Sequence, residues 1–251
     1  MGLSAAFFDL DRTLMAGSSG FHWARAAYSA GLVRRRQLWG DAWANVQFRL
    51  RGSTEAGTER VKARVGQWIA GRRALELQRL APGVLAGVLP RLYGQMLEVA
   101  YDHQDAGRPV FICTAASQET ADMLAHVLGF DGAAGSRFEQ HDGVYTGRLA
   151  GPFCYREGKA ARMRELAAAH DVDLAASYGY SDSASDLPML RAVGHPVAVN
   201  PDRELARAAA AEGWGVLRFE HLGRRLKFAA AVGAAAAVGG AGRAARARLA
   251  G

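Results

Sequence analysis

The chain has 251 residues, of which 50% are hydrophobic, 9% aromatic and 22% charged. This composition is typical of a globular protein with a full core, and it excludes disordered, collagen-like and coiled-coil proteins. The net charge of +7 would suit a nucleic-acid partner, but six cations follow the last acidic residue, Glu220, which leaves only +1 for residues 1–220. These six are Arg224, Arg225, Lys227, Arg243, Arg246 and Arg248.

The cysteine content and the first residues indicate the compartment. Cys113 and Cys154 are too few for a disulfide framework and suit a reducing environment. Carboxylates appear by Asp9, and no basic segment precedes the apolar run, unlike a signal peptide. We therefore expect a cytoplasmic protein.

The first part of the chain predicts one strand followed by helices. Residues 4–10 form a short apolar run that ends in acids and a turn-rich loop, which is typical of a buried strand. Residues 21–81 contain no proline and have apolar positions at helical spacing. We expect amphipathic helices over 21–31, 34–50 and 58–70, with breaks at Gly31 and Gly52.

From Pro82 onward, helices alternate with strands. The patterns predict a helix over 84–105, a strand over 109–114, and a helix that opens at Ser117 and ends near His126. A hairpin over 138–149 turns at Asp142-Gly143. A helix over 158–169, a strand over 176–180, a helix beginning near Pro188 and a strand over 196–200 follow in that order. This alternation indicates a parallel sheet covered on both faces, with 21–81 inserted after its first strand.

The basic tail contains 15 uncharged residues, 228–242, between Lys227 and Arg243. The favoured interpretation is a disordered or partly helical extension. The flanking cations also suit weak peripheral contact with an anionic membrane surface. A spanning helix needs about 20 predominantly apolar residues, so it is the least favoured of the three. Nucleic-acid binding is not expected, because no aromatic residue interleaves the tail arginines.

Two acidic motifs follow predicted strands. Asp9 and Asp11 stand two residues apart after the first strand, and Asp182 and Asp186 stand four apart after the strand over 176–180. Ligands bind outside the carboxyl ends of strands in open parallel sheets, where paired carboxylates suit a cation or phosphoryl transfer. Taken alone, each motif is equally explained as a turn or a helix cap.

Two further residues suit phosphate binding. Thr114 ends a predicted strand just before a helix, where a hydroxyl and free main-chain amides form an anion site. Lys159 lies near the start of the next predicted helix. Taken alone, the first is an ordinary strand-to-helix connection and the second a surface lysine.

The order of these motifs along the chain resembles the haloacid dehalogenase superfamily, and within it the phosphoserine-phosphatase-like subfamily. The resemblance covers residues 1–220 and implies an α/β fold, a Rossmann-like three-layer parallel sheet with an inserted helical cap. Residues 1–16 and 83–222 correspond to the catalytic core and 17–82 to the cap. Residues 223–251 are the basic, Ala/Gly-rich tail.

The resemblance implies a magnesium-dependent phosphatase. Asp9 would be the nucleophile that forms an aspartyl-phosphate, and Asp11 would protonate the leaving alkoxide and then activate water. Thr114 and the Ala115 amide would hold phosphate oxygens, and Lys159 would neutralise charge on the transferring group.

The same resemblance implies the metal ligands. Mg²⁺ would be held by the Asp9 carboxylate, the Asp11 main-chain carbonyl and the Asp182 carboxylate. Ser185 and Asp186 would support this site as neighbours or through water.

Three departures from the subfamily pattern concern the substrate. Ser18 stands where phosphoserine phosphatases carry a glutamate that recognises the substrate ammonium. Ala115 and Ala116 replace glycines, and Ser185 replaces an asparagine. The expected partner is a small-molecule phosphate ester, a phosphorylated metabolite or a lysophospholipid-type phosphate. A phosphoserine phosphatase, a phosphotransferase and a non-catalytic phospho-ligand-binding module are the alternatives.

Overall fold

The computed structural model describes residues 2–33 and 55–219. Contacts divide the chain into two units, Met1–Val216 and Leu217–Gly251, and the second lies almost wholly outside the described residues. The helix predicted over 34–50, the break at Gly52 and the tail over 223–251 also lie outside the described residues.

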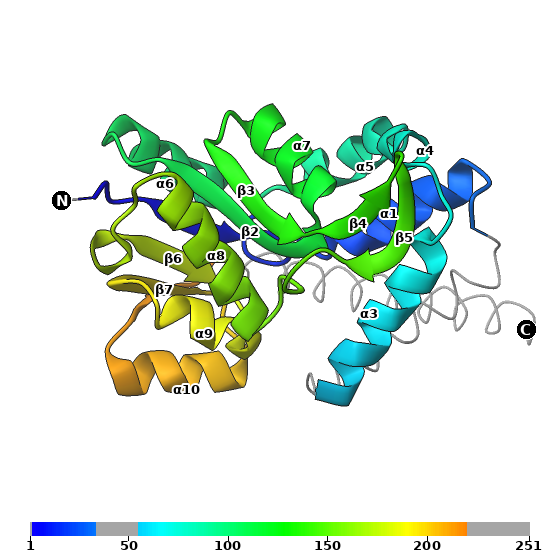
Figure 1. Ribbon diagram of the computed structural model, residues 1–251. Coiled ribbons are helices and arrows are strands. Elements are labelled where there is room, and N and C mark those ends of the chain that lie inside the picture. The colour runs from blue at the N-terminus through cyan, green and yellow to red at the C-terminus, as the bar shows by residue number, and fades with distance from the viewer. Residues whose placement is uncertain (1, 34–54, 220–251) are drawn as a thin grey trace, which may run out of the picture. The chain divides into compact units, whose positions relative to one another are not determined.

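A six-stranded sheet forms the centre of the first unit (Figure 1). The pairs β1–β2, β1–β6, β2–β3 and β6–β7 are all parallel, as the alternation of helices and strands predicted. In spatial order the strands are β3 (Gly132–Ser136), β2 (Val110–Ser117), β1 (Ala6–Asp9), β6 (Tyr178–Ser181), β7 (His195–Val199) and β8 (Gly215–Leu217).

Helices cover both faces of this sheet, which confirms the three-layer α/β fold (Figure 1). Phe7 packs with Met163 in a core beneath α8 (Glu157–Ala169), α9 (Leu187–Leu190) and α10 (Arg203–Glu212). The next residue, Phe8, points to the opposite face, because side chains alternate along a strand. There it meets His103 of α6 (Gly94–Asp105).

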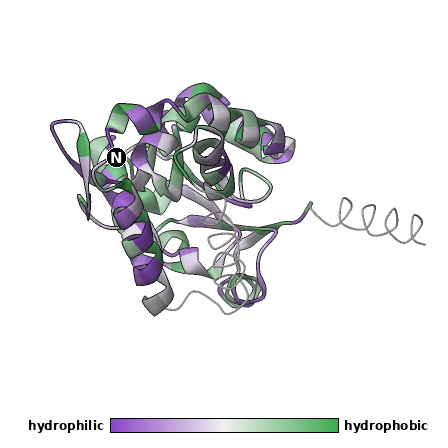
Figure 2. Ribbon diagram, turned by 90° about the vertical axis from the view of Figure 1, so that its right-hand side faces the viewer, coloured by the Kyte–Doolittle hydropathy of each residue, from purple (hydrophilic) through white to green (hydrophobic). Residues whose placement is uncertain are grey.

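Between β1 and α6 the described residues form α1 (Ser19–Ser29), α3 (Glu55–Ile69), α4 (Ala74–Gln78), α5 (Ala81–Val88) and the 3-10 turn η1 (Leu89–Arg91). Helix α3 begins at Glu55, the first residue described after the gap, and is largely hydrophilic in Figure 2. Its Ile69 joins Phe138 and Tyr145 in a second, small core.

That small core ties α3 to the antiparallel hairpin of β4 (Phe138–His141) and β5 (Val144–Leu149). Asp142 and Gly143 both have positive φ, 50° and 73°, which confirms the turn dipeptide predicted for this hairpin. The hairpin precedes α8. The assignment of residues 17–82 as a cap remains an interpretation.

The helix predicted over 84–105 was wrong as a single element. Pro90 lacks an N–H and its ring excludes a helical carbonyl four residues earlier, so α5 ends at Val88. Leu92 and Tyr93 are extended, and α6 then starts at Gly94. The strand predicted over 109–114 also continues further, to Ser117.

Helix α7 (Gln118–Leu128) follows that strand, and Ser117 caps it by accepting a hydrogen bond from the Thr120 amide, as predicted. Two short 3-10 turns, η2 (Leu174–Ala176) and η3 (Ala184–Asp186), flank β6. Within the two described segments, no helix is long and apolar enough to cross a membrane.

Candidate active site

The central strand β1 places Asp9 at the carboxyl edge of the sheet. Residues Ala6 to Phe8 are fully buried, and Asp9, the last residue of the strand, is 7% exposed. From β1 the strands follow one another outward on one side as β2 and β3, and on the other side as β6, β7 and β8, so the strand order changes direction at β1. Such a switch point is where open α/β sheets bind ligands.

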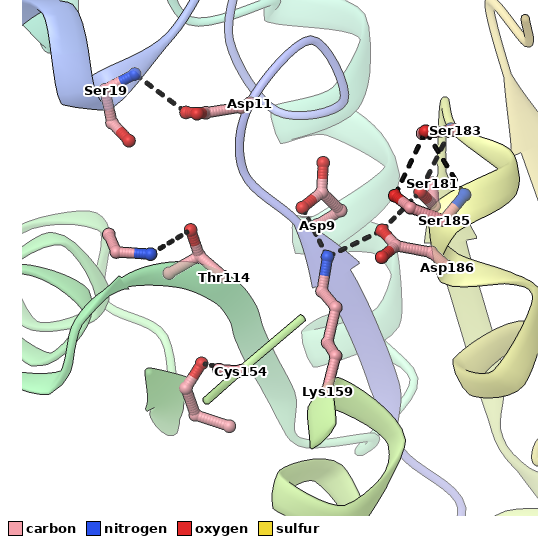
Figure 3. Close-up of polar contacts among 12 residues, drawn as sticks. Asp9, Asp11, Ser19, Thr114, Cys154, Lys159, Ser181, Ser183, Ser185 and Asp186 are labelled. Atoms are coloured by element: carbon pink, nitrogen blue, oxygen red, sulfur yellow. Dashed lines mark hydrogen bonds and ion pairs between the residues drawn. The ribbon is translucent and has the colours of Figure 1, made fainter. Parts of the chain in front are cut away.

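A buried lysine connects two of the predicted site residues. Lys159, in the first turn of α8, places its Nζ 2.5 Å from Asp9 Oδ1 and 2.6 Å from Asp186 Oδ2 (Figure 3). The lysine and Asp186 are each 3% exposed. Ser181 Oγ donates a second hydrogen bond to Asp186 Oδ2, at 2.7 Å. The surface-lysine alternative is therefore wrong for Lys159.

The pKa shifts in this group favour the charged form of Lys159 and disfavour the charged forms of Asp9 and Asp182 unless a further cation lies beside them. Burial by itself would lower the pKa of Lys159, but the Asp186 and Asp9 carboxylates raise it well above its usual value. Burial raises the pKa of Asp9 to about 7, with Lys159 opposing the shift and Asp186 adding to it. Burial and the neighbouring Asp9 raise the pKa of Asp182 to about 8.

Asp182 offers an oxygen to a cation. Its Oδ2 is buried and accepts no hydrogen bond, and the half-exposed guanidinium of Arg12 forms an ion pair with it. Of the three buried carboxylates, Asp9 and Asp186 pair with the buried ammonium of Lys159, and Asp182 pairs with the half-exposed Arg12. A cation beside Asp9 and Asp182 would offset the remaining negative charge.

The donor set fits Mg²⁺, which prefers oxygen ligands and keeps several waters. The residues that would hold it are the Asp9 and Asp182 carboxylates and the Asp11 main-chain carbonyl. Across residues 2–33 and 55–219, no three acidic, histidine or cysteine side chains form a ligand cluster. A metal here would therefore complete its shell with main-chain, water and phosphate oxygens.

Asp11 lies apart from the lysine group and contacts α1 instead. Ser18 Oγ donates to Asp11 Oδ2 at 3.0 Å, and the Ser19 amide donates to Asp11 Oδ1 at 2.8 Å. In Figure 3 the Asp11 carboxylate points toward Ser19 and away from Lys159. The two acids of the first motif thus have different partners.

Thr114 and Ala115 lie on β2, beside β1. Thr114 is buried, and its Oγ1 accepts a hydrogen bond from the Ala116 amide at 3.2 Å (Figure 3). Ala115 is exposed, and its carbonyl accepts a hydrogen bond from Ser136 Oγ. Because Asp9 pairs with Cys113 in register, Thr114 stands one residue and Ala115 two residues beyond the end of β1.

Ser185 has a more local role than the other site residues. Its Oγ donates to Ser183 Oγ at 3.1 Å in the turn η3. Sequence reasoning missed Ser181 and Arg12. Ser181 is the last residue of β6, directly before the acidic motif, and this position is the only feature of the sequence that could have indicated its role. Arg12 stands in the first motif with φ 69°, a backbone angle that the sequence does not reveal.

The two cysteines are not suited to nucleophilic chemistry. Burial raises the pKa of the Cys113 thiol well above its usual value and that of Cys154 to about 12. The reactive form of cysteine is the thiolate, which both positions disfavour. Cys113 therefore serves packing beneath α8.

Known proteins share this arrangement of sequence and fold. A sequence model of haloacid dehalogenase-like hydrolases matches residues 6–191. A phosphoserine phosphatase of Mycobacterium tuberculosis is 36% identical over 220 residues, which cover 86% of this chain and 71% of that protein. A histidinol-phosphatase of Neisseria meningitidis is 30% identical over 223 residues, covering 86% and 98%.

A solved structure agrees with these relatives. A Bordetella pertussis protein of unknown function superposes with a TM-score of 0.76 at 30% sequence identity, covering 86% of this chain and 99% of that one. The family match spans more than half of the chain and includes the strand that carries Asp9. The chain therefore belongs to the haloacid dehalogenase-like hydrolase family and is a phosphatase.

Proposed function

We propose that the protein is a magnesium-dependent phosphomonoester hydrolase that works through an aspartyl-phosphate on Asp9. The observation that carries the proposal is the buried contact of Lys159 with Asp9 and Asp186 at the carboxyl edge of the sheet. Phosphoryl transfer depends on positioning and on neutralising negative charge, and this group provides both.

In the first half-reaction an oxygen of Asp9 attacks phosphorus. A new P–O bond forms to Asp9 while the ester P–O bond breaks, and Asp11 gives its proton to the departing alkoxide. In the second half-reaction Asp11 takes a proton from water. The water oxygen then attacks phosphorus, and the bond to Asp9 breaks to release inorganic phosphate.

The remaining residues bind and orient the phosphoryl group. Lys159 keeps its positive charge beside Asp9 throughout, because two carboxylates surround it. Thr114 Oγ1 and the Ala115 amide would hold phosphate oxygens from β2. Mg²⁺, held by Asp9, Asp182 and the Asp11 carbonyl, would supply Lewis-acid neutralisation of the phosphoryl charge. Asp186 and Ser185 would keep Lys159 and the η3 turn in place.

The substrate class is a small phosphate ester, and residues 17–82 would form the cap above it. Ser18 carries no charge that could pair with a substrate ammonium, which disfavours phosphoserine. Two relatives are nevertheless named for esters that carry an amino group, phosphoserine and histidinol phosphate. A phosphorylated metabolite without such a group, or a lysophospholipid-type phosphate, remains our preferred substrate.

The test is release of p-nitrophenol from p-nitrophenyl phosphate, with magnesium and with EDTA. Asp9→Asn should reduce turnover to background with an unchanged far-UV circular dichroism spectrum, because it removes the nucleophile and no apolar contact. The control is Asp105→Asn, at the exposed end of α6. Wild-type turnover in Asp9→Asn would refute the mechanism. No turnover in any protein would leave two explanations, a cap too selective for this ester or a phospho-ligand-binding module, and trapping of an aspartyl-phosphate mimic with beryllium fluoride would favour the first.

A panel of esters then identifies the substrate. It includes phosphoserine, histidinol phosphate, glycerol phosphate and lysophosphatidate, each followed by release of inorganic phosphate. Transfer to added glycerol in place of water would reveal a phosphotransferase. A preference for phosphoserine would contradict the argument from Ser18.

A further inference from the structure

The first turn of α1 binds the side chain of Asp11. The main-chain N–H groups at the start of a helix have no partner within the helix and need an acceptor. Here the Ser19 amide finds one in Asp11 Oδ1, at 2.8 Å. Ser18, the N-cap residue, does not cap its own helix with its side chain. Its hydroxyl donates instead to Asp11 Oδ2, at 3.0 Å.

Both oxygens of this carboxylate are therefore held from one side. The main chain of the same loop is also fixed, because the Arg12 amide donates to the Met15 carbonyl at 2.7 Å. The positive end of the α1 dipole adds a favourable interaction with negative charge on Asp11. In Figure 3 this contact lies on the opposite side of Asp11 from Lys159.

These contacts affect the proposed transfer of a proton from Asp11 to the leaving alkoxide. As the proton leaves, negative charge develops on the carboxylate, and hydrogen bonds to a charged acceptor are about twice as strong as neutral ones. An interaction that strengthens on the way to the transition state accelerates the reaction. The hydroxyl of Ser18 and the amide of Ser19 are such interactions for departure of the alkoxide.

We propose that Ser18 and the Ser19 amide are positioning groups that orient Asp11 and stabilise its carboxylate as it protonates the leaving group. This rests on the proposed function. It assigns a role to position 18, where phosphoserine phosphatases resembling this chain carry a glutamate. It also makes α1, which follows the catalytic motif in sequence, part of the acid–base machinery.

Two substitutions remove the two donors separately. Ser18→Ala deletes the hydroxyl, and Ser18→Thr restores one. Ser19→Pro deletes the amide hydrogen at the first helical position, where proline is well tolerated. Ser18 has φ −137° and ψ 127°, the extended conformation that a residue before proline prefers. Ser29→Ala, at the exposed far end of the same helix, is the control.

The readout is the dependence of kcat/KM on the leaving group, which a merely structural role would not change. Phenyl phosphate and p-nitrophenyl phosphate have the same ring, but phenolate is the poorer leaving group. Its departure therefore depends more strongly on protonation by the general acid. We expect Ser18→Ala and Ser19→Pro to lose about tenfold on phenyl phosphate, the usual effect of one hydrogen bond to a charged group. The loss on p-nitrophenyl phosphate should be several-fold smaller.

Ser18→Thr should recover most of the phenyl phosphate rate, and Ser29→Ala should match the wild type on both esters. Equal losses on the two esters, or none, in variants with a wild-type melting temperature would overturn the positioning role while leaving the phosphatase proposal intact. Absence of magnesium-dependent turnover by the wild-type protein, or full turnover by Asp9→Asn, would instead overturn the proposed function and this inference with it.

Discussion

At the scale of single residues, the charge on Lys159 decides how the site holds together. Its ammonium touches two buried carboxylates from different elements, β1 and the η3 turn after β6. Removing one member of a buried ionic group leaves a charge without compensation, which costs more than the group contributes as a whole. The stability of this site is therefore cooperative among its members.

This predicts a non-additive double-mutant cycle. Lys159→Met should lower the free energy of unfolding by about 3–5 kcal/mol, because Asp9 and Asp186 then lose their buried cation. Lys159→Met combined with Asp186→Asn should lose less than the sum of the single changes. Urea unfolding in EDTA measures all four proteins, and additive losses would contradict the cooperative account. Both proteins that lack Lys159 should have no phosphatase activity.

Sequence patterns predicted some of these residues better than others. Asp9 and Asp11 stand two residues apart at the end of a recognisable buried strand, so local reasoning and the family resemblance both found them. The contact of Lys159 with Asp186 joins positions 27 residues apart, and only the packing of α8 on the sheet creates it. Arg12 was missed for a similar reason. Its partner Asp182 follows directly after β6, far from Arg12 in sequence, so only the fold brings the two together.

At the scale of elements, a buried histidine links α6 to the sheet. His103 Nδ1 accepts a hydrogen bond from Arg108 Nε at 2.7 Å, and its Nε2 lies 2.8 Å from Tyr180 Oη on β6. Since Nδ1 is the acceptor, a second proton would have to face the Arg108 guanidinium. Burial, and then this arginine, lower the pKa of His103 to about 4.

This link predicts loss of stability in mild acid. The unfolded histidine has a pKa of about 6.5, so between about pH 6.5 and 4 the unfolded state binds more protons and stability falls as pH falls. From pH 7 to pH 5 the contribution of His103 is a loss of up to about 2 kcal/mol. Urea unfolding at the two pH values measures the loss, with His103→Gln as the non-titrating comparison. An equal loss in both proteins would contradict the assignment.

A second element-scale prediction concerns the close approach of α3 to β5. A Cβ built on Gly147 would lie 2.7 Å from the Gly66 carbonyl oxygen, and one on Gly66 would press on the Gly147 main chain. Gly66→Ala should therefore destabilise the protein by about 1–3 kcal/mol, although alanine normally stabilises a helix. Gly94→Ala, whose Cβ would meet nothing within 4 Å, should be neutral or stabilising. Thermal unfolding distinguishes the two, and a stabilised Gly66→Ala would refute the contact.

Elements built from large apolar residues were predicted, and those built from small residues were not. β1 and β2 stand out as apolar runs, whereas β3 is Gly-Ala-Ala-Gly-Ser and has no strand signal. Its small side chains are needed because a Cβ on Gly135 would lie 2.8 Å from the Gln118 main chain at the start of α7. Such closeness depends on the tertiary packing and leaves no periodic pattern in the sequence.

At the scale of the whole molecule, charge is distributed unevenly along the chain. Residues 1–220 carry +1, and the remainder of the net +7 follows Glu220. Clusters of cations are attracted to anionic membrane surfaces by about 1 kcal/mol per charge, an interaction that salt screens. We propose that the tail cations make weak contact with anionic membrane surfaces, separately from the chemistry at Asp9.

The 251-residue chain should accordingly co-sediment weakly with phosphatidylserine vesicles at low salt and not with phosphatidylcholine vesicles. Replacing the six tail cations by glutamine should abolish sedimentation and leave turnover of p-nitrophenyl phosphate unchanged. Unaltered sedimentation in that variant would show that the tail charges play no part. The substituted residues are Arg224, Arg225, Lys227, Arg243, Arg246 and Arg248.

The buried lysine also has a consequence for how the protein folds. Its two partners lie 150 residues before it and 27 residues after it. Loop closure over such separations must precede any gain from the contact. A chain still emerging from the ribosome therefore holds Asp9 without its counter-charge until α8 and the segment after β6 have been made. The proposed catalytic centre therefore cannot be complete until the chain has been synthesised through Asp186.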